Sequence, residues 1–481
     1  MRGIFIMKLL SIVYNFLWGD LFRIPLPGGD SIGITLLILI LIPAGIFFTI
    51  RTRGLPFRLF PEMLRVSVER RQGEKRSISG LEALIVSTAT RVGMGNLVGV
   101  VAALSVGGAG AVFWMWVTAM IGSATAFAEG TLAQMHKTKD PLYGGYRGGP
   151  AYYIHDFYTK ITKKKKSILA VCFAASGLLC WCGISQVVSN SVTSAFSNAF
   201  SVPPLLTTIV ITGLAALIVL RKNMTVHVLD VIVPIMAAFY FALTIYVIVR
   251  NIGVMPRVFE RIFSEAFGFR QVAGGSLSGA LLNGIKRGLF SNEAGSGSAP
   301  CAAAAADVDH PVKAGLLQGL GVFIDTIVIC SCTAMLMLTV PQHLTDGLQG
   351  MELLQAAMGY HFGSAGIVFI SAVLFLFSFS TFIGVLYYAR SNVAYLFGDN
   401  WISQTLYKIL ALVMLFIGGL AAYTFVWDLG DVGIGLMTIF NMTALLPLSG
   451  QVIRTLKEYE QTRRERRAQQ EQAGRGGQKP E

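Results

Sequence analysis

Charged side chains are scarce in this sequence. Only 14% of its 481 residues are Asp, Glu, Lys or Arg, whereas 54% are hydrophobic. A water-soluble chain of this length would need more charge to cover its surface, so the composition excludes an ordinary soluble protein. A helix crosses a bilayer with about 20 apolar residues, and the apolar runs here are too long for barrel strands. The sequence predicts an all-α polytopic membrane protein.

Groups that carry catalysis are scarce as well. The six histidines lie at span edges or in loops, and no HExxH zinc motif is present. The six cysteines lie in or beside apolar spans, and Cys180/Cys182 and Cys330/Cys332 are spaced so that their side chains diverge on a helix. We interpret the cysteines as packing residues and expect no enzyme. A passive channel would need a ring of like residues, which nothing here suggests.

Long apolar runs are abundant. They predict eleven transmembrane helices, near residues 31–50, 80–107, 110–134, 168–197, 202–220, 228–249, 273–301, 312–338, 361–389, 403–425 and 430–453.

The net charge of +13 is spread unevenly along the chain. Most Lys and Arg residues fall in 51–79, 135–167 and 454–481, which share one side of the bilayer if the first span starts outside. Cytoplasmic loops of membrane proteins carry such a bias. We expect a bacterial inner-membrane protein with its N-terminus outside and its C-terminus in the cytoplasm, and the lipid bilayer rather than nucleic acid as its partner.

The two ends of the chain carry weaker signals. Residues 3–17, GIFIMKLLSIVYNFL, are followed by no small-residue cleavage site and predict an interfacial helix on the outer face. The polar tail at 463–481 predicts disorder.

Two apolar spans are interrupted by glycine and polar residues, TATRVGMGNLVG at 88–99 and GLFSNEAGSG at 288–297. Each interruption lies in the first helix of a run of five spans, 80–249 and 273–453. Because five is odd, the second run must insert upside down, which is the pattern of an inverted repeat. Interrupted helices at matching places in two repeats indicate a binding site near the bilayer midplane. A close glycine-mediated helix crossing is the alternative.

A broken helix exposes N–H groups on one half and C=O groups on the other. The N–H end suits a carboxylate, and the C=O end suits Na⁺ or an ammonium group. An amino acid carries both charges, so the two breaks together favour amino-acid transport.

Eight sequence blocks extend this pattern over nearly the whole chain. In order and spacing they resemble the alanine or glycine:cation symporters, also called sodium:alanine symporters: VGMGNLVGV (92–100), GGAGAVFWMWVTAMIGSATAFAE (107–129), GGPAYYI (148–154), RGLFSNEAGSGSAP (287–300), DHPVKAGL (309–316), FIDTIVIC (323–330), FSFSTFIG (377–384) and GLMTIFNMTALLPLSG (435–450). The resemblance implies the leucine-transporter fold of the amino acid-polyamine-organocation superfamily, which has a five-plus-five inverted repeat and here one extra N-terminal helix.

The resemblance also implies site residues. Substrate would lie between the first and sixth core helices, at Gly93, Gly95, Asn96, Phe290, Ser291, Asn292, Gly295 and Gly297. Amides near Gly95 and Asn96 are expected to hold the carboxylate, and carbonyls near Phe290 and Ser291 the amine. A Na⁺ site would join Gly93 to the hydroxyls of Ser380 and Thr381, since Na⁺ prefers hard oxygen ligands. A hydroxyl bonded to its own i−4 carbonyl is the alternative for these two residues.

The sequence departs from the family pattern at Met94, Val188 and Val385, where a Thr, a Gln and a Trp are usual. Smaller, less polar residues at 188 and 385 are expected to widen the pocket or change its selectivity.

Ionisable residues at membrane depth are functional candidates. We hypothesise that Arg91 and Glu293 neutralise each other across the two breaks; the alternative is that Glu293 binds a coupling ion or a proton. Glu129, Asp230 and Asp325 are interpreted as structural pairs or caps.

The predicted organisation has four parts. Residues 1–79 hold the interfacial helix, the extra span and a basic loop; 80–249 form the first repeat; 250–453 hold the second repeat with its leading outer loop; and 454–481 form a basic cytoplasmic tail. The predicted function is Na⁺-coupled uptake of alanine or glycine by alternating access. Another amino acid, or coupling to H⁺, is the alternative. The functional unit is expected to be a monomer, and the oligomeric state stays open.

Overall fold

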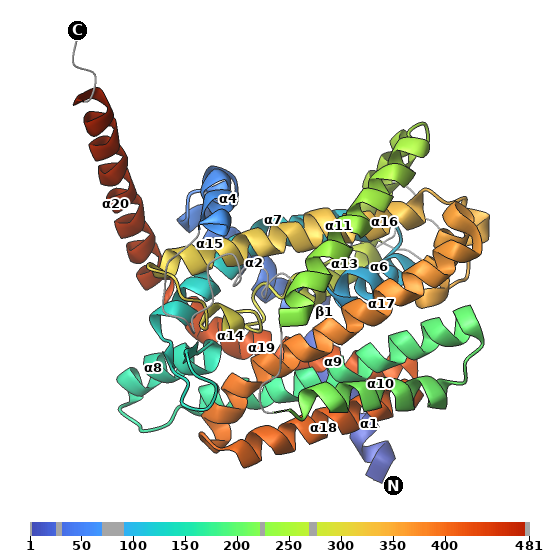
Figure 1. Ribbon diagram of the computed structural model, residues 1–481, viewed down its shortest axis with the longest axis horizontal. Coiled ribbons are helices and arrows are strands. Elements are labelled where there is room, and N and C mark those ends of the chain that lie inside the picture. The colour runs from blue at the N-terminus through green and yellow to red at the C-terminus, as the bar shows by residue number, and fades with distance from the viewer. Residues whose placement is uncertain (1, 26–30, 70–90, 222–226, 269–276, 477–481) are drawn as a thin grey trace.

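The computed structural model describes residues 2–25, 31–69, 91–221, 227–268 and 277–476. Within these ranges the chain is built almost wholly of helices, as the long apolar runs predict (Figure 1). Two short antiparallel hairpins complete it.

The N-terminal part contains the helices α1 (Arg2–Trp18), α2 (Leu36–Arg51), α3 (Leu55–Arg58) and α4 (Phe60–Val68), and the strands β1 (Asp20–Pro25) and β2 (Ser31–Thr35). Thr35 caps α2, because its hydroxyl accepts a hydrogen bond from the N–H of Ile38. The span predicted from residue 31 therefore begins as a strand, and its helix starts at Leu36.

The middle part runs from the first break to α12. Its elements are the π-helix η1 (Gly95–Gly99), the helices α6 (Val100–Gly107), α7 (Gly110–Met135), α8 (Pro150–Thr162), α9 (Ile168–Phe200), α10 (Pro204–Val219), α11 (His227–Arg250) and α12 (Met255–Ala266), and the strands β3 (Thr138–Lys139) and β4 (Tyr146–Arg147). The side chain of Asp230 in α11 lies outside the described part of the chain.

The C-terminal part begins with α13, the helix that leads into the second break. Its elements are α13 (Leu277–Asn292), α14 (Pro300–Ala303), α15 (Pro311–Val322), the π-helix η2 (Phe323–Cys330), α16 (Ser331–Leu338), the 3₁₀ turn η3 (Gln342–Leu344), α17 (Met351–Phe397), α18 (Trp401–Leu420), α19 (Tyr423–Leu445) and α20 (Ser449–Gly476). Gly363, at φ 63°, divides α17 into two helices.

Two packed groups make up the body of the molecule (Figure 1). In one, α9 packs against α17, α18 and α19; in the other, α7 packs against α13 and α15. The first break lies where η1 contacts both α13 and η2.

Helix lengths agree only in part with the predicted spans. Among the described residues, five helices are long and apolar enough to cross a bilayer, and seven if each of two sharply bent pairs counts as one span. Four shorter apolar helices accompany them. The number eleven and the inverted repeat stay predictions, because breaks, bends and undescribed residues interrupt several of the runs.

Two further expectations concern the ends. The interfacial position of the N-terminal helix stays a prediction; its end packs on the body, because Leu17 and Trp18 are buried and the indole N–H of Trp18 donates to the carbonyl of Asp431 at 3.0 Å. The predicted disorder of the tail is wrong up to Gly476, since these residues continue α20. The first turns of α20 pack against the body of the protein through the buried side chains of Val452, Leu456 and Tyr459. This packing stabilises a helix that the polar composition of the tail does not predict.

Candidate functional site: two interrupted helices

The first interruption is a kink at Gly93. Two amides here donate to side chains: the N–H of Gly93 donates to Asn96 Oδ1 at 2.8 Å, and that of Met94 to Thr381 Oγ1 at 3.0 Å. A Cβ at position 93 would collide with Thr381 Oγ1, so only glycine permits this approach. From Gly95 the chain continues as the π-helix η1, a distortion that is frequent at functional sites.

Thr381 therefore lies where the sequence placed it, against Gly93. Its hydroxyl also donates to the carbonyl of Phe377 at 3.0 Å, which is the i−4 bond weighed as the alternative. Both bonds coexist because a hydroxyl donates one and accepts others. Ser380 is buried beside it. The role of these residues as Na⁺ ligands stays a prediction.

The second interruption follows α13. Glu293 (φ 58°), Gly295 (φ 92°) and Gly297 (φ 84°) all adopt left-handed backbone, and helix resumes only at Pro300. The side-chain oxygen of Asn292 accepts from the N–H of Ala294 at 3.0 Å, so part of the freed backbone is satisfied locally. Gly295 and Gly297 leave helical geometry, as the sequence predicted.

A second acid holds this break from outside. Glu129 on α7 accepts from the N–H of Gly295 at 3.0 Å and from the amide of Asn441 on α19 at 2.6 Å. The same amide donates to the carbonyl of Gly295 at 3.0 Å, and the hydroxyl of Tyr153 donates to Asn441 Oδ1. The structural role expected for Glu129 is what these contacts provide.

The two breaks meet at Asp325, which is fully buried in η2. The amide of Asn96 donates to Asp325 Oδ1 at 2.7 Å, and the hydroxyl of Ser291 donates to Asp325 Oδ2 at 2.9 Å. Thr326 adds a third donor at 2.7 Å, and its hydroxyl accepts from the amide of Asn292 at 3.2 Å. In the described ranges no Lys, Arg or His lies within 4.0 Å to form an ion pair with this carboxylate.

Asp325 is the residue that sequence reasoning undervalued. It was taken as a pair or cap, yet its partners are two predicted site residues, Asn96 and Ser291. A carboxylate at membrane depth followed directly by a threonine was the available signal. A fully buried carboxylate held only by neutral donors can stabilise a positive charge that arrives beside it.

Within the described ranges, Arg91 and Glu293 form no direct ion pair, and the hypothesis that they neutralise each other across the two breaks stays a prediction. Arg91 instead donates to the carbonyl of Gln318 at 2.8 Å and to its Oε1 at 2.6 Å, and Glu293 has no ion pair within 4.0 Å among the described residues. Two acceptors on one residue bind the two terminal nitrogens of the guanidinium in a bidentate way without a carboxylate. Arg91 thus fastens the first break to α15.

Phe290 faces a different cluster. Its ring lies 4.8 Å from that of Trp427, over which the Arg287 guanidinium sits at 4.2 Å. Arg287 and Lys286 both pair with the buried Asp431, at 2.8 and 2.6 Å. Adjacent cations inside an apolar span were the signal for this cluster, which sequence reasoning passed over. Met94, Val188 and Val385 are all buried.

Comparison with known proteins adds an independent finding. The model of the "Sodium:alanine symporter family" matches residues 29–473. The chain is 38% identical over 464 residues to the "Amino-acid carrier protein AlsT" of Bacillus subtilis (strain 168), with 96% of this chain and 94% of that protein covered. It is 41% identical over 433 residues to the "Probable sodium/glutamine symporter GlnT" of the same organism, with 89% of each chain covered.

A solved structure shows a similar fold. The crystal structure of MhsT in complex with L-phenylalanine superposes with a TM-score of 0.51 at 15% identity, covering 79% of this chain and 89% of that one. At such low identity the likeness concerns the course of the backbone alone.

Proposed function

This chain belongs to the sodium:alanine symporter family, and on that basis we propose that it is a secondary active transporter coupling Na⁺ entry to uptake of a small neutral amino acid, alanine or glycine. The family is one of transporters, not enzymes. The observation that carries the proposal is the meeting of the two broken segments at Asn96, Ser291 and Asp325. A zwitterion needs donors and acceptors at one place inside the lipid, and broken helices supply both.

Substrate is proposed to bind across the two breaks. The backbones approach closely, since a Cβ at Gly95 would lie 3.2 Å from the Cα of Ser291. Amides near Gly95 and Asn96 hold the carboxylate, and carbonyls near Phe290 and Ser291 hold the ammonium group. The buried carboxylate of Asp325 favours the positive charge, either of the ammonium group or of a coupling cation.

Na⁺ is transported together with the amino acid. Its proposed ligands are Thr381 and Ser380 on α17 and the backbone at Gly93. The bond from the Met94 N–H to Thr381 supports this assignment, because it already ties the first break to α17. An ion shared between the break and α17 would strengthen that tie, order the unwound backbone and raise amino-acid affinity, and the coupling is reciprocal.

The surrounding fold is proposed to be leucine-transporter-like, with two inverted repeats of five helices after one extra helix. The likeness to MhsT and the two interrupted helices support this reading. The group containing α7, α13 and α15 would rock against the group containing α9, α17 and α18 to open the site alternately to each side. We place the protein in the bacterial inner membrane as a functional monomer, with the N-terminus outside and the C-terminus in the cytoplasm.

A second candidate is transport of a larger neutral amino acid. The 41% identity to a probable sodium/glutamine symporter favours it, and Val188 and Val385 are expected to widen the pocket. Coupling to H⁺ in place of Na⁺ is the other alternative, because buried Asp325 and Glu293 both carry carboxylates.

Uptake by proteoliposomes tests the proposal. Labelled L-alanine should accumulate when an inward Na⁺ gradient is imposed, and more strongly with a negative interior, since each charge moved gains about 2.3 kcal/mol per 100 mV. Competition by glycine and by glutamine separates the two substrate candidates. Accumulation driven by a pH gradient alone, without Na⁺, would contradict sodium coupling.

A further inference from the structure

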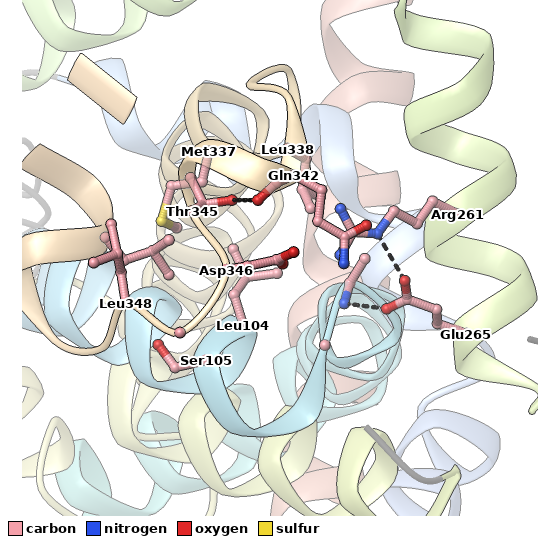
Figure 2. A pocket seen from close by; sticks show the side chains of 14 residues that line it. Leu104, Ser105, Arg261, Glu265, Met337, Leu338, Gln342, Thr345, Asp346 and Leu348 are labelled. Carbon is pink, nitrogen blue, oxygen red and sulfur yellow. Dashed lines mark hydrogen bonds and ion pairs between the residues drawn. The ribbon is translucent and has the colours of Figure 1, made fainter. Parts of the chain in front are cut away.

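A cavity of about 120 Å³ lies apart from the two breaks (Figure 2). It is enclosed by the end of α6, the start of α7, α12, the end of α16 and the loop 339–350, with Leu353 of α17 completing its wall. None of the residues at the breaks lines it. The cavity is large enough for several water molecules, since one needs about 10–15 Å³ of such space.

One wall of the cavity carries a fixed guanidinium. Arg261 on α12 donates through Nε to Glu265 Oε1 at 2.7 Å. The other oxygen of Glu265 accepts from the N–H of Ala109 at 2.5 Å, at the start of α7. Glu265 is buried, and both of its carboxylate oxygens accept hydrogen bonds from these groups. The two terminal nitrogens of Arg261 make no hydrogen bond within the described ranges.

The opposite wall carries a carboxylate. Asp346 lies in the loop 339–350, where its N–H donates to the carbonyl of Gln342 at 2.9 Å. Figure 2 shows its side chain directed into the space between the loop and the side of Arg261. In the part of the chain that the structure describes, its carboxylate forms no ion pair within 4.0 Å and no side-chain hydrogen bond.

The cavity thus has the two unbonded terminal nitrogens of Arg261 on one wall and the carboxylate of Asp346 on the other, with no ion pair between them within 4.0 Å. A simple anion would engage only Arg261, and a simple cation only Asp346. A molecule carrying a carboxylate and an ammonium group satisfies both, and a carboxylate also matches the two terminal nitrogens of a guanidinium. Leu104, Met337 and Leu348 offer an apolar wall for a short side chain.

We propose that this cavity is a second binding site for a small α-amino acid, with its carboxylate on Arg261 and its ammonium group on Asp346. The choice of amino acid rests on the proposed function. The site uses fixed side-chain charges, so its occupancy needs no Na⁺, in contrast to the proposed central site. An occupant would connect α12 with the loop 339–350, which lies between α16 and α17. It would thereby link the two packed groups of helices.

The test is the binding stoichiometry of labelled L-alanine on the purified full-length protein in detergent, measured in NaCl and in KCl. We expect two molecules per protein in NaCl and one in KCl. Asp346→Asn should bind one in NaCl and none in KCl. This variant changes an exposed side chain whose carboxylate forms no ion pair or hydrogen bond in the described ranges, so its folding is expected to be unaffected.

Two companion variants sharpen the comparison. Glu352→Gln removes an exposed acid six residues along the same segment, outside the cavity, and should bind as the wild type does. Leu348→Trp fills the cavity without changing any charge and should behave like Asp346→Asn. In KCl, propionate and ethylamine, which each carry half of the zwitterion, should displace alanine far less effectively than glycine does.

The outcomes separate the two sites. A wild type that binds one alanine in NaCl and none in KCl would overturn the second site and leave the proposed function standing. One alanine in both salts, lost in Asp346→Asn, would support the second site and contradict a sodium-dependent central site. Displacement of alanine in KCl by added phosphatidylethanolamine would assign the cavity to a lipid headgroup and overturn the proposal.

Discussion

At the scale of single residues, the site depends on side chains that hydrogen-bond to the backbone. Asn96 and Thr381 accept from the buried amides of Gly93 and Met94 at the kink. An unpaired buried N–H costs about 1–3 kcal/mol, so each substitution affects stability as well as binding. A conservative substitution that keeps the hydrogen-bond acceptor, such as Ser for Thr, separates the effect on stability from the effect on binding.

Thr381→Ala is expected to raise the Na⁺ concentration for half-maximal uptake at least tenfold, which corresponds to about 1.4 kcal/mol. The order of preference among amino acids should stay the same, because Thr381 lies on the ion side of the first break. Thr381→Ser keeps the hydroxyl and is the matched control. Sodium activation of the alanine variant equal to that of wild type would rule out Thr381 as a ligand.

Asp325→Asn keeps the volume of the side chain and removes its charge. The hydroxyls of Ser291 and Thr326 can reverse their bonds to the amide, so we expect a small change in thermal unfolding in detergent and a loss of uptake of at least tenfold. A merely structural role predicts the opposite result, with a clear loss of stability and uptake that falls only in proportion to the folded protein.

At the scale of elements, interruptions rather than helices define the function. The break after α13 is held by three left-handed residues and by Glu129 and Asn441 from two other helices. A continuous helix would satisfy its own backbone and offer a ligand nothing. The left-handed backbone of this segment costs free energy, and the hydrogen bonds with Glu129 and Asn441 offset part of that cost.

Gly295→Ala tests this cost. Left-handed backbone disfavours a side chain by about 1–2 kcal/mol, and a Cβ here would also press on Met442. We expect a lower midpoint of thermal unfolding and reduced uptake. Gly213→Ala in α10 is the control, since a Cβ there meets no neighbour within 4 Å and alanine favours helix. Equal unfolding midpoints for the two variants would show that the break is not strained.

At the scale of the whole molecule, the first half of α20 is fastened to α3 and α4 before the helix projects from the body (Figure 1). Glu62 on α4 is buried; it accepts a hydrogen bond from Tyr459 at 2.8 Å and forms an ion pair with Arg463 at 2.7 Å, and Arg58 pairs with Glu460 at 2.7 Å. The helix that follows α19 is thereby joined to α3 and α4 in the N-terminal part of the chain.

Reversing one charge should release this contact. Arg463→Glu places like charges beside buried Glu62, at a cost we expect near 1–3 kcal/mol, between that of exposed and buried pairs. Proteinase K should then cleave the C-terminal helix faster. Adding Glu62→Arg should restore part of the resistance. If the single variant is as resistant as wild type, the pair does not hold the helix in place.

The sequence by itself determined the class of the protein, its family and the places where its helices break. These features are local: the length of an apolar run sets a membrane helix, and glycines that allow left-handed backbone mark Gly295 and Gly297 as non-helical. The contact of Gly93 with Thr381 was also foreseen, but through family resemblance and not through any local rule.

Tertiary structure alone decided the partners. Arg91 hydrogen-bonds to Gln318, 227 positions away; Asp325 joins the two breaks; and the first half of α20 docks on Glu62. The cavity between Arg261 and Asp346 likewise depends on tertiary structure, because its walls come from separate elements. Pairing of polar groups depends on which helices pack together, and a one-dimensional pattern of hydrophobicity does not carry that information.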